Sequence, residues 1–487
     1  MIDTLAAHVP FDHPREACGV FGIVAPGLDV ARVTYFGLYA LQHRGQESAG
    51  IAAASGEAGS DLRIHTRMGL VATAFDEQIL RSLTGTLAIG HTRYSTTGSS
   101  VACNAGPVLV ESDLGPIAIA HNGNLTNAAL LRAALESRGE TFETSTDSEV
   151  LARVIARAPG ATVAERIIAA MGQFEGAYSL AVLTPTTLFA VRDPLGLRPL
   201  SIGRLGEGWV VASETCAFAT TGTAFVRDVA PGEVVEITAV NGPQSIALRR
   251  GERDALCVFE LIYFARPDSM MGGERIHLLR QRMGAELAFE QPADADIVVP
   301  LPDSAIPAGI GYANASGLPY TEALIKNRYI GRTFIQPDQH LRDVGIALKF
   351  NPLPEVLEGK RVVLVDDTIV RGTTSRPIVQ LLRDAGAREV HMRVHAPPIM
   401  WPCFMGVDFA SRSELIAARY DADVAEIGRQ IGVDSLAYLS LDGLFRAIGQ
   451  PRDGFCTACL TGEYPVPLHE DASKFALERP LAAHAAS

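Results

Sequence analysis

Two adjacent aspartates, Asp366 and Asp367, end an apolar run in this chain of 487 residues. Residues 362–365 have the pattern of a buried strand, a loop rich in Thr and Gly follows the acids, and a helical pattern begins at about Ser375. Carboxylates at the carboxyl end of such a strand accept from sugar hydroxyls or hold a hard cation such as Mg2+, and a loop of small residues before a helix binds phosphate. An acidic turn that only caps a helix would not need the run of small residues, and no Gly-Lys-Ser/Thr indicates a Walker A loop. The stretch predicts a site for a phosphorylated sugar.

A second set of reactive side chains lies near the start of the chain. Cys18 directly precedes the β-like run GVFGIVA, a position where a lone Cys more often packs than reacts. Removal of residues 1–17 would give Cys18 a free α-amino group with a pKa of about 8, which can act as general base for its own thiol. Four polar motifs that follow change the interpretation of this cysteine: His43–Ala52, Gly90–Gly98, Ala120–Asn127 and Thr144–Leu151.

The elements that must position these residues fall into two patterns. From Gly19 to about Leu248, short β-like runs dominate, with helical patterns at Asn127–Arg138 and Ser148–Ala158, which predicts packed sheets covered by helices. Strands then alternate with helices, which predicts a parallel sheet: helices at Glu274–Glu290 and Ala305–Asn314, strands at Ile297–Pro300 and Val362–Val365. We expect domains at residues 18–250 and 251–464, followed by an irregular tail, 465–487.

The composition excludes several classes of protein. A net charge of −13 and a pI near 5.4 argue against a nucleic-acid-binding face, which would be basic. No apolar run approaches the length of a membrane span, and the first residues lack the basic start and apolar core of a secretory signal. Seven cysteines in a chain of this length do not suggest a disulfide framework. We therefore expect a cytoplasmic protein with no nucleic-acid or membrane partner.

The N-terminal motifs, taken together, closely resemble the glutaminase domain of N-terminal-nucleophile amidotransferases, which have an αββα sandwich fold. The resemblance implies that Cys18 attacks glutamine, that Asn122 and the Gly123 N–H form the oxyanion hole, and that Arg93, Thr96 and Asp147 bind the substrate. It leaves the two histidines that flank these motifs, His91 and His121, to pack or to orient loops.

The acidic loop resembles the phosphoribosyl-pyrophosphate (PRPP) loop of type I phosphoribosyltransferases, whose fold is a parallel α/β domain. The resemblance implies that Asp366 and Asp367 hold the ribose hydroxyls with Mg2+, near Ser304 of the pyrophosphate loop 298–313. Residues of the loop and of a mobile flap, 326–351, are implied to contact PRPP: Thr368, Arg371, Gly372 and Thr373 in the loop, and Lys326, Arg328, Arg332 and Lys349 in the flap.

Both sets of motifs in this order resemble the family of glutamine phosphoribosylpyrophosphate amidotransferases over essentially the full chain. The resemblance implies that ammonia from glutamine displaces pyrophosphate from C1 of PRPP, in the first step of de novo purine synthesis. It also implies an ammonia channel, inhibition by purine nucleotides and a homo-oligomer. A PRPP-sensing regulator without catalysis is the first alternative, and the complete set of glutaminase residues argues against it. Another amidotransferase of the same nucleophile class is the second, and the PRPP loop argues against it.

Cys456 and Cys459 form a CxxC, which alone fits zinc, a redox pair, an iron–sulfur ligand pair or coincidence. With Cys257 and Cys403, they match the positions that hold a [4Fe–4S] cluster in the branch of the family that has an N-terminal propeptide, here residues 1–17. We expect a structural or oxygen-sensitive cluster remote from the chemistry. The two remaining cysteines, Cys103 and Cys216, are expected to be buried small hydrophobic residues.

Overall fold

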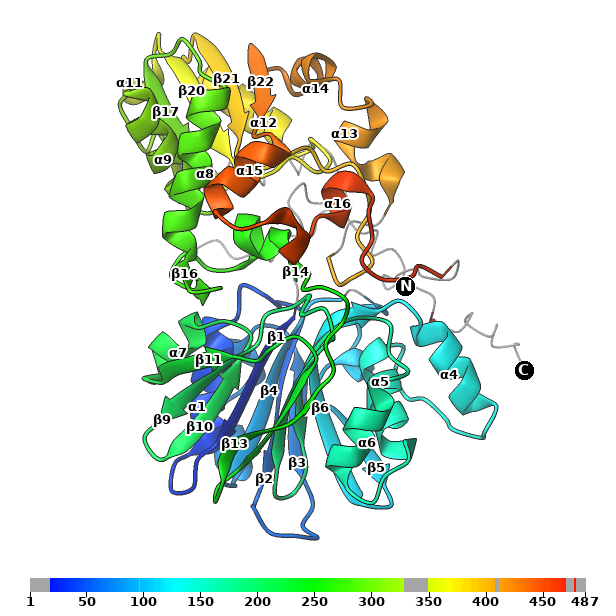
Figure 1. Ribbon diagram of the computed structural model, residues 1–487. Coiled ribbons are helices and arrows are strands. Elements are labelled where there is room, and N and C mark those ends of the chain that lie inside the picture. The colour runs from blue at the N-terminus through cyan, green and yellow to red at the C-terminus, as the bar shows by residue number, and fades with distance from the viewer. Residues whose placement is uncertain (1–17, 96, 328–348, 408–410, 470–476, 479–487) are drawn as a thin grey trace, which may run out of the picture.

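The structure is a computed structural model that describes residues 18–95, 97–327, 349–407, 411–469 and 477–478. Two parts of the chain are stacked on each other (Figure 1). The lower part in this view contains the strands up to β13 (Gly242–Leu248), and the upper part contains the elements from β14 (Leu256–Cys257) onward. The expected leader, residues 1–17, lies outside the described residues.

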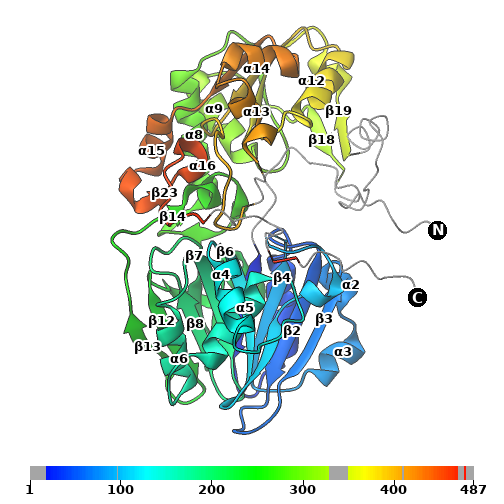
Figure 2. The ribbon, with the colours of Figure 1, turned by 90° about the vertical axis from the view of Figure 1, so that its right-hand side faces the viewer.

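The lower part is built from two antiparallel sheets packed face to face, with helices on both outer faces (Figures 1 and 2). The predicted αββα sandwich is confirmed. One sheet has the order β11 (Ala224–Asp228), β9 (Ser201–Leu205), β10 (Gly208–Ala212), β1 (Gly19–Val24), β4 (Leu87–Arg93), β2 (Ser48–Ala54), β3 (Arg63–Met68). The other has the order β13, β12 (Glu233–Thr238), β8 (Leu188–Arg192), β7 (Gly176–Leu183), β6 (Gly115–Leu125), β5 (Val108–Ser112). The helices are α1 (Val30–Ala40), α2 (Val71–Ala74), α3 (Glu77–Ser82), α4 (Ala128–Glu136), α5 (Asp147–Arg157), α6 (Val163–Ala170), α7 (Cys216–Thr221) and the 3-10 turn η1 (Ala102–Asn104).

The central strands of both sheets are continuous apolar runs in the sequence because both of their faces are buried. Every residue of β1, β2, β4 and β7 is buried. The layer between the sheets contains many small side chains, including Ala118, Ala120 and Ala181, so the sheets can approach closely. Cys18 directly precedes β1, and Arg93 is the last residue of β4.

The upper part contains a four-stranded sheet in which every neighbouring pair is parallel. The predicted parallel α/β domain is confirmed. Its strand order is β17 (Ile297–Pro300), β20 (Arg361–Asp366), β21 (Glu389–Val394), β22 (Ser435–Tyr438). Its helices are α8 (Ile276–Glu290), α9 (Ile306–Ser316), α11 (Pro354–Leu357), α12 (Ser375–Asp384), α13 (Ile416–Arg419), α14 (Val424–Ile431), α15 (Leu441–Ile448) and α16 (Ala458–Thr461), with 3-10 turns η3 (Arg412–Glu414) and η4 (Arg452–Gly454).

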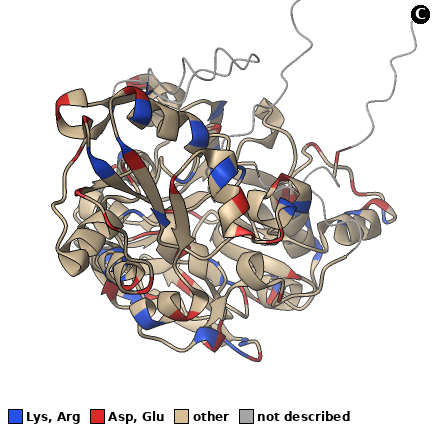
Figure 3. Ribbon diagram, turned by 90° about the horizontal axis from the view of Figure 1, so that it is seen from above, with Lys and Arg blue, Asp and Glu red and all other residues tan. Residues whose placement is uncertain are grey.

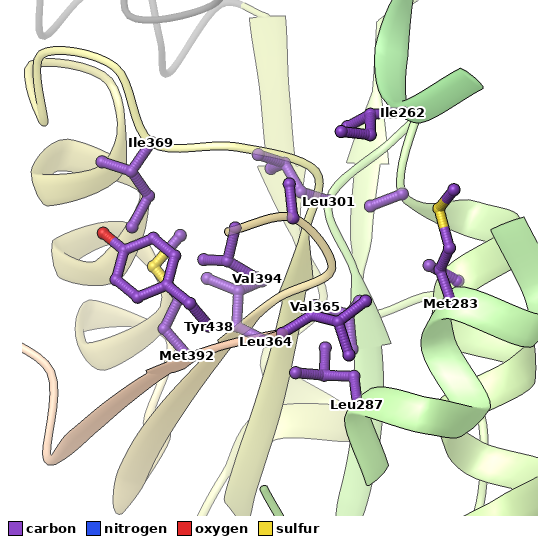
Figure 4. Close-up of a cluster of buried hydrophobic side chains, with 14 of the residues drawn as sticks. Ile262, Met283, Leu287, Leu301, Leu364, Val365, Ile369, Met392, Val394 and Tyr438 are labelled. Carbon is purple, nitrogen blue, oxygen red and sulfur yellow. The ribbon is translucent and has the colours of Figure 1, made fainter. Parts of the chain in front are cut away.

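A hydrophobic core holds this parallel sheet against its helices (Figure 4). Leu364 and Val365 of β20 are buried near the side chains of Met283 and Leu287 from α8. Burying one such side chain contributes about 1.5–3 kcal/mol. The core fixes the end of β20, whose last residue is Asp366 and which Asp367 follows.

Three short strand pairs lie outside the parallel sheet in the described upper part. β14 pairs in parallel with β23 (Phe455–Cys456), β15 (Met270–Met271) pairs with β16 (Glu274–Arg275), and β18 (Leu324–Lys326) pairs with β19 (Phe350–Pro352). A π-helix, η2 (Glu260–Phe264), follows β14 at the junction. Such single π-turns often occur at functional sites.

The remaining expectations concern membrane spans, surface charge and the burial of Cys103 and Cys216. No helix among the described residues is both long and apolar enough to span a membrane. Lys and Arg are interspersed with Asp and Glu on the face seen from above (Figure 3). The expectation that Cys103 is buried is wrong, because this residue is exposed in the turn η1, outside both sheets, whereas Cys216 is buried as expected.

Candidate active sites

Cys18 lies directly before β1 and is 7% exposed. Its thiol donates to the Tyr94 carbonyl over 3.3 Å and accepts from the Tyr94 N–H over 3.4 Å. Burial raises the pKa of the thiol to about 11. The thiol is therefore protonated near neutral pH, and it needs a base before it can act as a nucleophile.

A pair of groups suited to an oxyanion hole lies on β6, which packs against β1 in the opposite sheet. The Asn122 side chain is fully buried, and neither its Nδ2 nor its Oδ1 has a hydrogen-bond partner among the described residues. Gly123 has a φ of 150°, and a Cβ at this position would lie 2.0 Å from the Ala177 carbonyl oxygen. The glycine is required there, and the free Asn122 amide is available to a ligand.

Two charged residues close to Cys18 are suited to a zwitterionic amino acid. Arg93 ends β4, and its guanidinium donates to the carbonyls of Thr97 (3.0 Å) and Ser99 (3.2 Å). Asp147 begins α5 and accepts from the Leu125 N–H over 3.1 Å. Both charges act on the Cys18 thiol, so the fold brings together three residues that are far apart in sequence.

The histidines next to these motifs are buried. His91 bonds to the His121 carbonyl over 2.9 Å, and burial lowers its pKa to about 3. His121 lies 3.7 Å from Asp147, and burial also lowers its pKa. Both rings are therefore largely neutral at pH 7. Thr96, the third expected glutamine ligand, lies outside the described residues.

Several groups that the sequence motifs did not single out contact Cys18 or the strand of Asn122 and Gly123. The Nε of Arg44 donates to the Cys18 carbonyl over 3.2 Å. Two further contacts come from the loop that carries Cys403: Asn124 donates to the Phe404 carbonyl over 2.9 Å, and Gly406 packs against Gly123. Arg44 belongs to the HRGQE motif, which drew attention to the segment but not to this contact.

At the second candidate site, the carboxyl end of β20 presents three buried polar residues, Asp366, Asp367 and Thr368. The Asp367 N–H donates to the Asp366 carboxylate over 2.8 Å, and the Thr368 hydroxyl donates to Asp367 over 2.7 Å. The Ser304 hydroxyl, from the neighbouring strand's loop, also donates to Asp367. The expected cation ligands therefore converge on one point at the edge of the parallel sheet.

The loop after the aspartates runs to Ser375, where α12 begins as predicted. Gly372 has a φ of 76°, and an added Cβ would lie 2.6 Å from Ile416. Thr373 is exposed at the tip. The Arg371 guanidinium pairs with Glu414 at 2.6 Å, an interaction that no sequence motif indicated.

The base of the expected flap is a two-stranded pair, with Lys326 on β18 and Lys349 just before β19. Lys326 forms an ion pair with Asp303 of the pyrophosphate loop. The Lys349 ammonium lies 5.3 Å from the centre of the Phe350 ring. Arg328 and Arg332 lie outside the described residues.

The four cysteines of the expected cluster lie on three segments that meet at the junction. Pairing of β14 with β23 sets Cys257 beside Cys456, and the Met400 and Trp401 N–H groups donate to the Cys459 carbonyl. Cys403 acts electrostatically on the other three. Burial raises the pKa of Cys257 to about 11 and that of Cys456 to about 12.

The loop that carries Cys403 continues onto the first domain. Phe404 and Gly406, which follow Cys403, contact the strand of Asn122 and Gly123. Spacing along the chain did not reveal how this loop folds back onto the first domain.

Within the described part of the chain, one group of His, Cys, Asp and Glu ligand atoms lies within 4.8 Å of one another: His43, Glu214 and Cys216. Both oxygens of Glu214 are already occupied. One accepts from His43 and Arg44, and the other accepts from Ser269 and the Arg266 N–H. The nearby guanidinium also disfavours a cation. The group is a hydrogen-bonded charge network.

Comparison with known proteins gives consistent matches. A family model described as a glutamine amidotransferase domain matches residues 91–220. An amidophosphoribosyltransferase of Synechocystis sp. is 54% identical over 475 residues, which are 96% of this chain and 95% of the relative. An amidophosphoribosyltransferase of Bacillus subtilis is 47% identical over 462 residues, with 94% and 96% covered.

Solved structures agree. The glutamine phosphoribosylpyrophosphate (PRPP) amidotransferase from B. subtilis, complexed with ADP and GMP, has a TM-score of 0.87 and 46% identity, and the match covers 93% of this chain and 98% of that chain. A structure described as the allosteric regulatory enzyme of purine biosynthesis has a TM-score of 0.89 and 46% identity, with 96% and 100% covered.

Proposed function

The chain belongs to the amidophosphoribosyltransferase family, and we propose that Cys18 and the Asp366–Asp367 loop are the centres of its two active sites. The enzyme hydrolyses glutamine and transfers the ammonia to C1 of PRPP, with release of pyrophosphate. The product is 5-phosphoribosylamine, and the reaction is the first step of purine biosynthesis. Each half-reaction has its own set of residues, one in each domain.

In the glutaminase half-reaction, removal of residues 1–17 frees the α-amino group of Cys18. The amine takes the proton of the thiol, and the sulfur attacks the side-chain amide carbon of glutamine. Asn122 Nδ2 and the Gly123 N–H stabilise the oxyanion, and the proton passes to the departing ammonia. Water then hydrolyses the thioester and releases glutamate. The unpartnered amide of Asn122 is the observation that carries this assignment.

Glutamine is held through its charged ends. Arg93 binds the α-carboxylate, aided by Thr96, and Asp147 pairs with the α-ammonium group. The proximity of both charges to Cys18 supports this arrangement, since a substrate between them has its amide within reach of the thiol.

In the transfer half-reaction, Asp366 and Asp367 hold the ribose hydroxyls, and with Ser304 they would hold Mg2+. The hydrogen bonds that converge on Asp367 support this donor set, which is of the oxygen type that Mg2+ prefers. Mg2+, when bound, neutralises charge on the departing pyrophosphate. Loop residues hold the 5-phosphate, and flap lysines face the pyrophosphate: Thr368, Arg371, Gly372 and Thr373 in the loop, Lys326 and Lys349 in the flap.

We propose that Cys257, Cys403, Cys456 and Cys459 would hold a [4Fe–4S] cluster. Four thiolates around one tetrahedral zinc would lie about 3.8 Å apart, from Zn–S bonds of about 2.3 Å. No three of these described cysteines have sulfurs within 4.8 Å of one another, a wider spacing than one zinc ion would need, which supports an iron–sulfur centre. When bound, the cluster ties three chain segments together at the domain junction.

Iron and acid-labile sulfide assays on anaerobically purified protein, with visible absorption, test the cluster. Cys456→Ser should lose the absorption, whereas Cys103→Ser, outside the group, should keep it. A colourless protein loaded with zinc would contradict the assignment.

Other features extend this proposal. The domains are 18–250 and 251–464, with a propeptide, 1–17, and a tail, 465–487. Purine nucleotides inhibit the enzyme, as suggested by the ADP and GMP in the B. subtilis structure. The enzyme is a homo-oligomer in the cytoplasm, and the absence of disulfides among its seven cysteines supports the reducing compartment.

Cys18→Ala tests the assignment of the two sites. The variant should lose glutamine-dependent synthesis and retain synthesis from added ammonium, because the PRPP loop is untouched. If both activities vanished with the fold intact, the assignment of two separate sites would be wrong. Intact mass of the wild-type protein shows whether residues 1–17 are removed.

A further inference from the structure

A fully buried guanidinium contacts the backbone of the nucleophile. Arg44 is 0% exposed, and its Nε donates to the Cys18 carbonyl over 3.2 Å. Its remaining nitrogens contact two carboxylates: Glu214 of the first domain at 2.5 Å and Glu260 of the second at 2.7 and 3.0 Å. Glu214 of the first domain and Glu260 of the second therefore hold the Arg44 guanidinium against the Cys18 carbonyl.

Glu260 belongs to the second domain, and its carboxylate contacts Arg44 of the first domain. It is 0% exposed and receives both terminal nitrogens of Arg44, the two-pronged geometry that suits a carboxylate best. It also accepts from Arg198 over 3.1 Å. Two guanidiniums and two carboxylates, Arg44, Arg198, Glu214 and Glu260, are therefore buried together, and Glu214 also contacts the His43 ring over 2.8 Å.

The backbone of Glu260 is anchored in the phosphoribosyltransferase domain. Glu260 begins the π-helix η2, and the guanidinium of Arg280 donates to the carbonyls of Leu261 and Ala265, each over 2.9 Å. Arg280 in turn acts electrostatically on Asp367 of the PRPP loop. The position of Glu260 is thus set by the domain that binds PRPP.

We propose that Glu260 is a positioning residue for the glutaminase reaction, supplied by the phosphoribosyltransferase domain, which fixes Cys18 through Arg44. The proposal rests on the proposed function of Cys18 as an N-terminal nucleophile. It means that the glutaminase site is completed by a side chain from the other domain.

The first reason for this role of Glu260 is the geometry of the contacts that hold Cys18. Once residues 1–17 are removed, a single peptide bond ties Cys18 to the chain, so contacts of its own atoms decide where the amine and thiol point. Tyr94 fixes the sulfur, and Arg44 fixes the carbonyl. If Arg44 loses its two-pronged partner, the amine and thiol lose part of their alignment, and small misplacements of reacting groups are costly.

The second reason for this role of Glu260 is its negative charge beside Arg44. The charged groups around Cys18 are Arg93, Glu47, Asp147 and Arg44. Loss of the negative charge on Glu260 leaves Arg44 partly uncompensated, and a nearby positive charge disfavours the protonated amine. The acidic limb of glutaminase activity should then move to lower pH, an effect that loosened packing alone would not produce.

Glu260→Gln and Glu260→Asp separate the two reasons. Glu260→Gln keeps the size of the side chain and removes the charge, so glutaminase kcat should fall about tenfold to a hundredfold, with the acidic limb lower by about one pH unit. Glu260→Asp keeps the charge but is one methylene shorter, so kcat should fall while the limb stays in place. KM for glutamine should change little, since Arg93 and Asp147 are intact.

The assay uses the full chain, with intact mass to establish equal removal of residues 1–17. Ammonium-dependent synthesis serves as the measure of the folded second site. Glu233→Gln is the matched control, because Glu233 is a buried carboxylate paired with Arg227 at 2.7 Å, away from both sites. It should leave glutaminase kcat and the pH limb unchanged.

Wild-type glutaminase kcat and pH profile in Glu260→Gln would overturn the proposal, as would equal losses of both activities in that variant. If Glu260→Gln does not accumulate as folded protein, wild-type kcat in Glu260→Asp would overturn it. Failure of the proposed function is distinct, because Cys18→Ala would then retain glutamine-dependent synthesis.

Discussion

Replacement of Gly406 by Ala should impair the glutaminase site from the opposite domain. Gly406 has a φ of +96°, and its Cβ would lie 2.9 Å from the Gly123 carbonyl carbon and 3.0 Å from its oxygen. Carbon atoms in contact normally lie about 3.5–4.0 Å apart, so one backbone must move by about 0.5 Å or more. Such a movement would displace Gly123, whose N–H we propose as part of the oxyanion hole.

The expected magnitude follows from that displacement. A misplacement of about 1 Å can cost about 10²-fold in rate, so a shift of about half that size should lower glutaminase kcat about tenfold. The left-handed backbone conformation adds about 1–2 kcal/mol of destabilisation for any residue with a Cβ. Ammonium-dependent synthesis should persist, because the PRPP loop is not involved.

Gly432→Ala provides the matched control. Gly432 has a similar φ of +91°, but an added Cβ there would have no neighbour within 4 Å. Both variants should therefore lose a few degrees of thermal stability, with the larger loss in Gly406→Ala, and Gly406→Ala alone should show the tenfold fall in glutaminase kcat. Equal glutaminase kcat in the two variants would refute the idea that the Cys403 loop positions the oxyanion hole.

Three further predictions concern single side chains. Asn122→Ala should lower glutaminase kcat about 10²- to 10³-fold, with little change in KM for glutamine. Glutamate release measures both constants. A large rise in KM with a normal kcat would instead indicate that Asn122 binds the substrate in the ground state. Asp367→Asn should impair PRPP use with glutamine or ammonium as nitrogen source, and unchanged PRPP kinetics would contradict its role. The pKa of His91 is lowered to about 3 in the folded protein, so the unfolded chain binds the proton more tightly and stability should fall as pH drops from about 6.5 towards 3. His91→Asn should reduce the dependence of the free energy of unfolding on pH by up to about 1.4 kcal/mol per pH unit, measured by urea unfolding at several pH values. An unchanged pH dependence would show that His91 does not contribute.

Local sequence was sufficient for several parts of the fold. The apolar run before Asp366 and the helix beginning at Ser375 are both found where they were predicted. These elements depend on spacing and on residue types within one segment, so no distant partner was needed to foresee them. The pairing of Arg371 with Glu414 was not foreseeable, because its partner lies in a separate turn 43 residues away.

One wrong prediction and one unforeseen contact have a related cause. Cys103 was expected in the core because of its residue type, but it lies in an exposed turn. The loop after Cys403 folds against Gly123, a contact that no motif indicated. Residue type and chain spacing define what a side chain can do, and neither specifies which surface its loop will cover.

The sequence by itself determined the chemistry: a cysteine that can become N-terminal, an acidic loop at a strand end, and two patterns of secondary structure. The tertiary structure decided which groups meet. Arg44 and Glu260 are 216 residues apart, and each is ordinary in its own segment. They form a buried ion pair against Cys18 because two separately packed domains meet there, and no local pattern encodes that contact.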